Sequence, residues 1–214
     1  MYTRRDFAAR VLGGLLGAGL LLGPLSSAAR RTWATSRKVL TKATTRAGLI
    51  HENPADLDTT NLALTPLEAF DTMGETDRVV DLSTWRLEVA GLVRHPLRFT
   101  YTQLTALPSI EREVLLICPG FFANHGRWKG LSIATLLRQA DVDPTATRIL
   151  IGDADGKTAR YALADVLSGK VFLAYQVNGV ALPRKHGFPL RVVAEDHYGG
   201  EWVKYVAKLT LERT

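Results

Sequence analysis

The chain has 214 residues, 46% hydrophobic and 22% charged, as in an ordinary globular domain, and its one cysteine, Cys118, excludes an internal disulfide framework. The formal net charge is +6, but residues 1–46 hold nine Lys and Arg against the single acid Asp6, so the rest of the chain, with 18 basic and 20 acidic residues, carries −2. The high isoelectric point therefore belongs to the N-terminal segment, and the charge predicts no nucleic-acid partner for the domain.

The N-terminus has the pattern of an export signal. The sequence Thr-Arg-Arg-Asp-Phe at residues 3–7 resembles the twin-arginine motif, and an apolar stretch follows it over residues 11–25. Five glycines interrupt this stretch, which is shorter than the roughly 20 apolar residues of a membrane span. Small residues at 26–29 suit cleavage. We predict a signal peptide over residues 1–29 and export of the folded protein to the periplasm by the twin-arginine machinery, with a membrane anchor if the signal is not removed.

Residues 30–64 are basic and then polar, and we predict that they form a linker or an arm lying over a domain of residues 65–214. Hydrophobic alternation and short apolar runs predict strands in that domain over residues 85–90, 97–101, 114–117, 148–151, 171–177, 189–194 and 203–211. Two short helices are predicted, one with Thr102 and the other with Ser132 as its N-cap, and Asn178-Gly179 predicts a two-residue hairpin turn. Few short helices among closely spaced strands indicate an α+β fold, with mostly mixed or antiparallel β-sheet.

Cys118 ends the predicted strand 114–117 and is followed by Pro119-Gly120, so its side chain would project into the crevice formed by the next segment. A thiolate there is suited to be a nucleophile or a soft-metal ligand, whereas a buried thiol is often only a small apolar side chain. Near the C-terminus, His186, Arg191 and Lys204 form a row of donors. Arg and Lys together suit a phosphorylated ligand, although each can equally be an ordinary surface cation.

These residues carry a resemblance to a known family. The sequence His-Gly-Phe-Pro-Leu-Arg-Val-Val at 186–193, followed by Gly199 and Trp-Val-Lys at 202–204, resembles the oxidoreductase molybdopterin-binding domain of the sulfite oxidase family. Cys118, with Trp128 and Gly130 after it, resembles the upstream block of the same domain. The resemblance extends over roughly residues 65–214 and implies the sulfite oxidase molybdopterin-binding fold.

The resemblance also implies a cofactor and its ligands. The cofactor would be molybdenum-molybdopterin, the metal carrying oxygen-atom and electron transfer, with Cys118 as the protein ligand to molybdenum. The residues that fall on family positions contacting the pterin or its phosphate are His186, Arg191, Trp202, Val203 and Lys204, with Asp153 as a looser match.

The chain departs from sulfite oxidases where those enzymes hold an anionic substrate. No arginine follows Cys118 in residues 119–125, and residues 70–74 lack a basic side chain. Because a small dianion would meet an apolar, aromatic wall, we expect oxygen-atom transfer with a neutral S- or N-oxide, either a small molecule or a protein S-oxide, as in the branch of the periplasmic methionine sulfoxide reductase catalytic subunit. That subunit also contacts its cofactor through an asparagine-rich N-terminal segment. This chain lacks the segment and has Thr65-Pro66 in its place. His125, on the predicted loop after Cys118, is our candidate for the catalytic proton donor.

Electrons must then come from elsewhere, because the chain has no haem-attachment motif and one cysteine cannot hold an iron–sulfur cluster. We expect a separate electron-transfer partner, a cytochrome or a membrane haem protein. Two alternatives stay open at this point. One is an exported binding module with the same fold and no catalysis, and the other is a hydrolase with Cys118 as its nucleophile.

Overall fold

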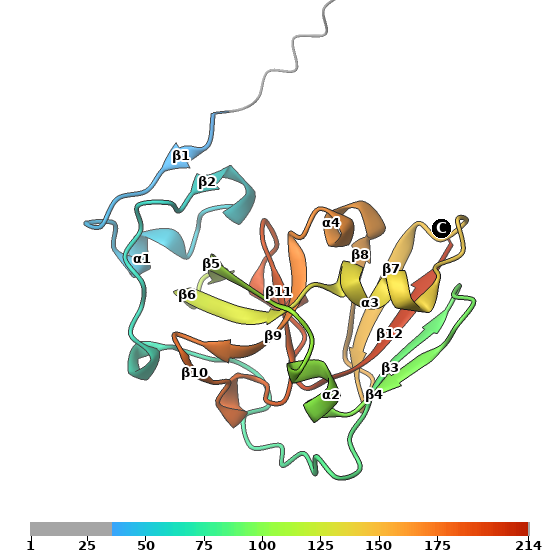
Figure 1. The fold of residues 1–214 in the computed structure, drawn as a ribbon. Helices are drawn as coiled ribbons and strands as arrows, with labels where there is room; N and C mark the ends of the chain where they lie inside the picture. Colours follow the sequence, from blue (N-terminus) through green and yellow to red (C-terminus); the bar gives the residue numbers. More distant parts are fainter. Residues whose placement is uncertain (1–35, 214) are drawn as a thin grey trace, which may run out of the picture. The chain divides into compact units, whose positions relative to one another are not determined.

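The computed structural model describes residues 36–213, which contain two five-stranded sheets (Figure 1). The predicted signal peptide and the start of the predicted linker lie outside the described residues. Among residues 36–213, no helix is long and apolar enough to cross a membrane.

The first sheet has the strand order β10-β9-β6-β5, and β11 also pairs with β9. Its strands, all antiparallel to their neighbours, are β5 (Ser109–Cys118), β6 (Phe122–Leu131), β9 (Val171–Val177), β10 (Val180–Ala181) and β11 (Arg191–Ala194). The predicted hairpin turn joins β9 to β10, with positive φ angles of 49° at Asn178 and 81° at Gly179. Such angles suit Asn-Gly, which therefore fixes the register of this hairpin.

The second sheet has the order β4-β3-β12-β7-β8. Its strands are β3 (Leu87–Gly91), β4 (Leu97–Phe99), β7 (Arg148–Asp153), β8 (Thr158–Ala162) and β12 (Val206–Glu212). Because β12 is parallel to β3 and antiparallel to β7, this sheet is mixed. The predicted α+β class, dominated by mixed and antiparallel sheet, is confirmed.

One hydrophobic core joins the two sheets and the short helices. Helix α3 (Ile133–Ala140) buries Ile133, Leu136, Leu137 and Ala140 in it, as the sequence pattern predicts, and α4 (Leu163–Leu167) buries Val166. Burying a leucine or isoleucine side chain stabilises the fold by about 1.5–3 kcal/mol, so this shared core holds the two sheets together.

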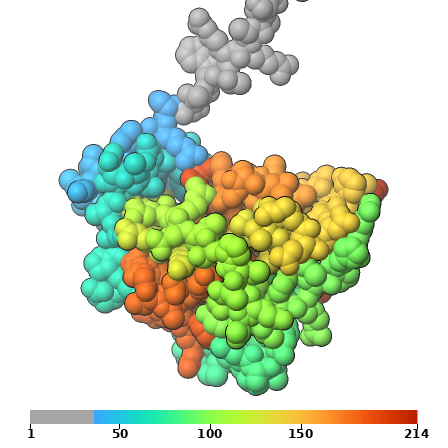
Figure 2. Space-filling view, viewed as in Figure 1, coloured from blue at the N-terminus to red at the C-terminus, as the bar shows by residue number. Residues whose placement is uncertain are grey.

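Residues 36–64 contain β1 (Lys38–Val39), α1 (Arg46–Leu49), the 3₁₀ turn η1 (Pro54–Asp56) and β2 (Leu57–Asp58). We call this segment the arm. Its leucines form a second hydrophobic cluster with one face of the β5–β6 hairpin; the members are Leu40, Leu49, Leu57, Leu62, Leu115, Ile117 and Ala123. In Figure 2 the arm, coloured blue to cyan, lies against the yellow-green surface of that hairpin. A further 3₁₀ turn, η2 (Leu67–Ala69), leads from the arm to the rest of the chain.

Two predictions about local structure are wrong. The segment after Cys118 is a three-residue turn, residues 119–121, followed by the ten-residue strand β6, and not a loop, because hydrogen bonding to β5 and β9 organises it as a strand. Helix α2 (Tyr101–Thr105) has Thr100, not Thr102, as its N-cap. Thr100 and Gln103 form a capping box, in which Thr100 Oγ1 accepts from Gln103 N at 3.2 Å and Gln103 Oε1 accepts from Thr100 N at 2.8 Å. Ser132 occupies the predicted N-cap position of α3, but its side chain makes no capping hydrogen bond.

Candidate cofactor site

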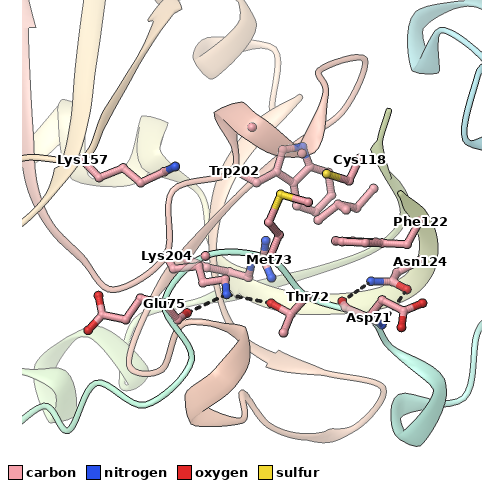
Figure 3. A pocket seen from close by; sticks show the side chains of 15 residues that line it. Asp71, Thr72, Met73, Glu75, Cys118, Phe122, Asn124, Lys157, Trp202 and Lys204 are labelled. Carbon is pink, nitrogen blue, oxygen red and sulfur yellow. Dashed lines mark hydrogen bonds between the residues drawn. The ribbon is translucent and has the colours of Figure 1, made fainter. Parts of the chain in front are cut away.

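Cys118 lies in a pocket because of the register of the β5–β6 hairpin. Cys118 pairs with Phe122, and Leu116 pairs with Asn124. Paired residues on antiparallel strands place their side chains on the same face, so these four side chains line one wall of the pocket (Figure 3). The pocket contains about 680 Å³ of empty space, part of it open to solvent.

The C-terminal segment forms a second wall. The 3₁₀ turn η4 (Gly199–Glu201) brings the backbone of Gly199 against β5, where a Cβ on Gly199 would lie 3.1 Å from Leu116 Cδ2. Gly187, after the 3₁₀ turn η3 (Arg184–His186), has φ 109°, and a Cβ there would lie 2.9 Å from Lys204 Cβ. Only glycine adopts this positive φ without strain and leaves room for Lys204, so Gly187 allows the backbone to pass close to that lysine.

Residues 71–75 form a third wall, and Lys204 connects it to the second. The Lys204 ammonium donates to Thr72 Oγ1 at 2.7 Å and to the Glu75 carbonyl at 2.9 Å (Figure 3), and also to the Lys185 carbonyl at 2.9 Å. Burial, and next the positive charge of Arg191, lower the pKa of Lys204 from 10.5 to about 8. An anion bound in the pocket would oppose both effects and keep this lysine charged.

Arg191 is the most deeply buried cation of the pocket, with 4% of its surface exposed. Its guanidinium carbon lies 5.1 Å from the centre of the Trp128 ring and 5.5 Å from that of Trp202, and its Nη1 donates to the His186 carbonyl at 3.1 Å. Within residues 36–213 it forms no ion pair, and its Nε has no hydrogen-bond partner. Burial lowers its pKa from 12.5 to about 10, so the group remains charged at neutral pH at a cost in free energy.

These features fit molybdopterin. Two buried nitrogens without partners, Arg191 Nε and His186 Nε2, lie in the segment that borders the pocket. Arg191 and Lys204 supply positive charge that suits a phosphate, and Lys157 points into the same space (Figure 3). Burial raises the pKa of the Cys118 thiol, which disfavours the free thiolate that a cysteine hydrolase needs, whereas a metal would displace that proton on binding.

The structure separates two predicted site residues from the pocket. His125 is on β6 next to Asn124, so its side chain faces the opposite side of the hairpin, where its Nδ1 lies 3.2 Å from the Ala63 carbonyl of the arm. Burial lowers its pKa, and it cannot act as a proton donor beside Cys118. Asp153 does not line the pocket either, because its Oδ2 accepts from Arg78 at 3.1 Å and its Oδ1 accepts the Lys157 backbone N–H at 2.9 Å.

The remaining predicted contacts differ in what they offer. Trp202 lines the pocket, but its Nε1 donates to the His197 carbonyl at 3.2 Å, so it presents only its ring. His186 and Val203 are buried next to pocket residues without lining the pocket. Burial lowers the pKa of His186 to about 3, so its imidazole is neutral at physiological pH. Sequence reasoning missed Lys157, and it considered residues 70–74 only for their lack of a basic side chain. Asn124 lies in the segment after Cys118 that was predicted as a loop, and the strand alternation of β6 is the signal that would have oriented it.

Comparison with known proteins shows the family of the chain. The family model described as "Oxidoreductase molybdopterin binding domain" matches residues 73–214. The chain is 30% identical over 162 residues to the protein-methionine-sulfoxide reductase catalytic subunit MsrP of Gluconobacter oxydans, covering 65% of this chain and 52% of that protein. It is 30% identical over 134 residues to the uncharacterized oxidoreductase YuiH of Bacillus subtilis, covering 62% and 68%.

The fold is also that of a solved structure, the sulfane dehydrogenase SoxCD from Paracoccus pantotrophus. The TM-score is 0.66 at 23% sequence identity, and the match covers 84% of this chain and 51% of that one. The chain thus spans about half the length of both MsrP and the SoxCD chain.

Proposed function

The chain belongs to the oxidoreductase molybdopterin-binding domain family, and we propose that it uses molybdenum-molybdopterin to reduce neutral organic S-oxides. It is an oxidoreductase domain of the sulfite oxidase fold. When bound, the molybdenum supplies the oxygen-atom and electron transfer. Reduction of one S-oxide consumes two electrons and two protons and releases one sulfide and one water.

Different residues of the pocket would bind different parts of the cofactor. Cys118 would be the protein ligand to the metal, and its exposure to the pocket from the end of β5 supports that role. Arg191 and Lys204 would hold the phosphate, because Arg191 is buried and Lys204 half-buried at the pocket, and no carboxylate among the described residues pairs with either. The Trp202 ring and the Gly199-Gly200 backbone would form the wall that contacts the pterin.

The observation that carries the substrate proposal is the position of the charges. In Figure 3, Cys118 and its neighbours Phe122 and Asn124 are on one side of the pocket, and the ammonium groups of Lys157 and Lys204 are on the other. Among the described residues, the one charged side chain that lines the pocket on this side is Asp71, whose carboxylate pairs with Arg46, so the wall beside Cys118 offers no free positive charge to a dianion such as sulfite. The name of the relative MsrP, a protein-methionine-sulfoxide reductase subunit, points to the same substrate class.

The test uses the purified holoenzyme with a reduced viologen dye as electron donor. We expect oxidation of the dye with dimethyl sulfoxide and with methionine sulfoxide, free or in a peptide, and no oxidation of sulfite when ferricyanide replaces the dye. Sulfite oxidation without S-oxide reduction would contradict the proposal. Molybdenum-free protein from cells that make the cofactor would instead favour a binding module without catalysis.

We further propose that the protein works in the periplasm with a separate cytochrome or membrane haem protein as its electron donor. The twin-arginine pattern at residues 3–7 and the lack of haem or iron–sulfur motifs in the sequence support this. Replacing Arg4 and Arg5 by lysine should retain the protein in the cytoplasm, as measured by cell fractionation. Periplasmic protein at the wild-type level would contradict the assigned export route.

A further inference from the structure

Asn124 is a buried amide on the wall that carries Cys118. Its side chain lines the pocket, yet the residue is only 2% exposed. A side-chain amide has two N–H donors and an oxygen with two acceptor positions. The oxygen accepts from Arg46 Nη2 at 3.0 Å and from the Asp71 backbone N–H at 3.3 Å, and Nδ2 donates to the Asp71 carbonyl at 2.8 Å. Among the described residues, the second N–H of Nδ2 has no acceptor, although a buried donor normally has one.

The neighbours of Asn124 also fix which way its amide faces. Both groups that contact Oδ1 are donors, and the group that contacts Nδ2 is a carbonyl. A flipped amide would place an NH₂ group against the Arg46 guanidinium and lose all three hydrogen bonds. The orientation follows from the network, and it leaves the spare hydrogen on nitrogen.

Arg46 comes from helix α1 of the arm, outside the residues matched by the family model. Its Nε donates to the Ala123 carbonyl at 2.8 Å, and its Nη2 forms an ion pair with Asp71 at 2.6 Å in addition to contacting Asn124. Arg46 does not line the cofactor pocket. Its charge is balanced by Asp71, and the β6 wall presents a neutral amide to the pocket in place of a cation.

We infer that Asn124 donates the hydrogen bond that holds the oxygen of the substrate, and that Arg46 is a positioning residue acting through Asn124. The inference rests on the proposed function, since an S-oxide is neutral overall and its oxygen is a strong acceptor. A single neutral N–H matches that oxygen, whereas a free guanidinium would favour an anion. The arm thus takes part in substrate selection through Arg46, although the Arg46 side chain does not contact the substrate.

The test compares Asn124→Asp, Arg46→Lys and the double variant with wild-type holoenzyme. Aspartate keeps the size of asparagine and an oxygen for Arg46 but removes the donor. Arg127→Lys is the control, because Arg127 is also on β6 and, within residues 36–213, its side chain pairs with exposed Glu113 alone. Two quantities are measured for dimethyl sulfoxide: KM in the dye assay, and Kd for the oxidised holoenzyme without an electron donor, where no turnover occurs. Molybdenum content reports loading and folding.

We expect Asn124→Asp to raise both KM and Kd at least about fivefold, the loss of one neutral hydrogen bond, at unchanged molybdenum content. Arg46→Lys should raise them less, and it should have no further effect in the Asn124→Asp background, because Arg46 acts through the amide. The control should match wild type. An unchanged Kd in Asn124→Asp, with an active wild type, would overturn the role of Asn124 alone. Equal effects of Arg46→Lys in both backgrounds would overturn the positioning role, and a wild type that reduces no S-oxide would overturn the proposed function together with this inference.

Discussion

Replacing Arg191 by methionine should separate cofactor binding from folding. The guanidinium is buried between Trp128 and Trp202 without an ion-pair partner among residues 36–213. Lowering its pKa from 12.5 to about 10 corresponds to about 3 kcal/mol of destabilisation, present at every pH below about 10. Methionine removes this cost. It also loses the cation–π contacts, worth about 2 kcal/mol, and leaves the His186 carbonyl unpaired, which costs about 1 kcal/mol.

These effects nearly cancel in the cofactor-free protein, so its free energy of unfolding should change by less than about 1 kcal/mol. Cofactor binding should respond strongly, because each charge-assisted hydrogen bond to a phosphate contributes about 1.5–3 kcal/mol, or at least about tenfold in affinity.

The assay has two parts. Urea unfolding is measured on protein from cells that cannot make molybdopterin, and molybdenum per chain is measured on protein from cells that can. Arg160→Met, which removes an exposed arginine paired with Glu212, is the control and should change neither quantity appreciably. A loss of 3 kcal/mol or more in the cofactor-free Arg191 variant, or wild-type molybdenum content in the loaded one, would refute the reasoning.

Three further predictions follow from the same geometry. Gly187→Ala should displace Lys204 and lower the molybdenum content, because the new Cβ would lie 2.9 Å from Lys204 Cβ. Gly156→Ala is the control: its φ is also positive, at 98°, but its new Cβ would meet no atom within 4 Å, so it should cost about 1 kcal/mol of stability and leave the metal content unchanged. Cofactor binding to the cofactor-free protein should weaken as pH rises through 8, since the pKa of Lys204 is about 8 and phosphate binding then requires proton uptake; a flat affinity from pH 7 to 9.5 would exclude this. His125→Gln should leave kcat, KM and their pH profiles unchanged while lowering the free energy of unfolding by about 1–2 kcal/mol. If the variant instead changed the pH profile of kcat, His125 would take part in catalysis after all.

Much of the fold could be predicted from the sequence because its signals are local. Alternating hydrophobic residues and the Asn178-Gly179 turn mark strands and a hairpin within a few residues. Strand β6 could not be recognised in this way, because Asn124 and His125 are polar but buried. Their partners Arg46, Ala63 and Asp71 are 53 to 78 residues away in sequence, so tertiary contacts decide their conformation.

The same limit explains the errors at the site. Cys118, Arg191, Trp202 and Lys204 were predicted through the family resemblance, and all four line one pocket. On a strand, however, adjacent side chains face opposite sides, so the register of β6 decides between Asn124 and His125 as the residue beside Cys118. A loop has no such alternation, so the predicted loop could not show which of Asn124 and His125 faces the pocket.

Elemental analysis of molybdenum in wild type and Cys118→Ser, purified from the same molybdenum-replete cells, tests the account most directly. We predict close to one molybdenum per wild-type chain, and for the variant an altered visible spectrum with loss of S-oxide reduction at unchanged folding, as measured by circular dichroism. Wild-type protein without molybdenum, or a variant with the wild-type spectrum and activity, would contradict the assignment of Cys118 as the metal ligand.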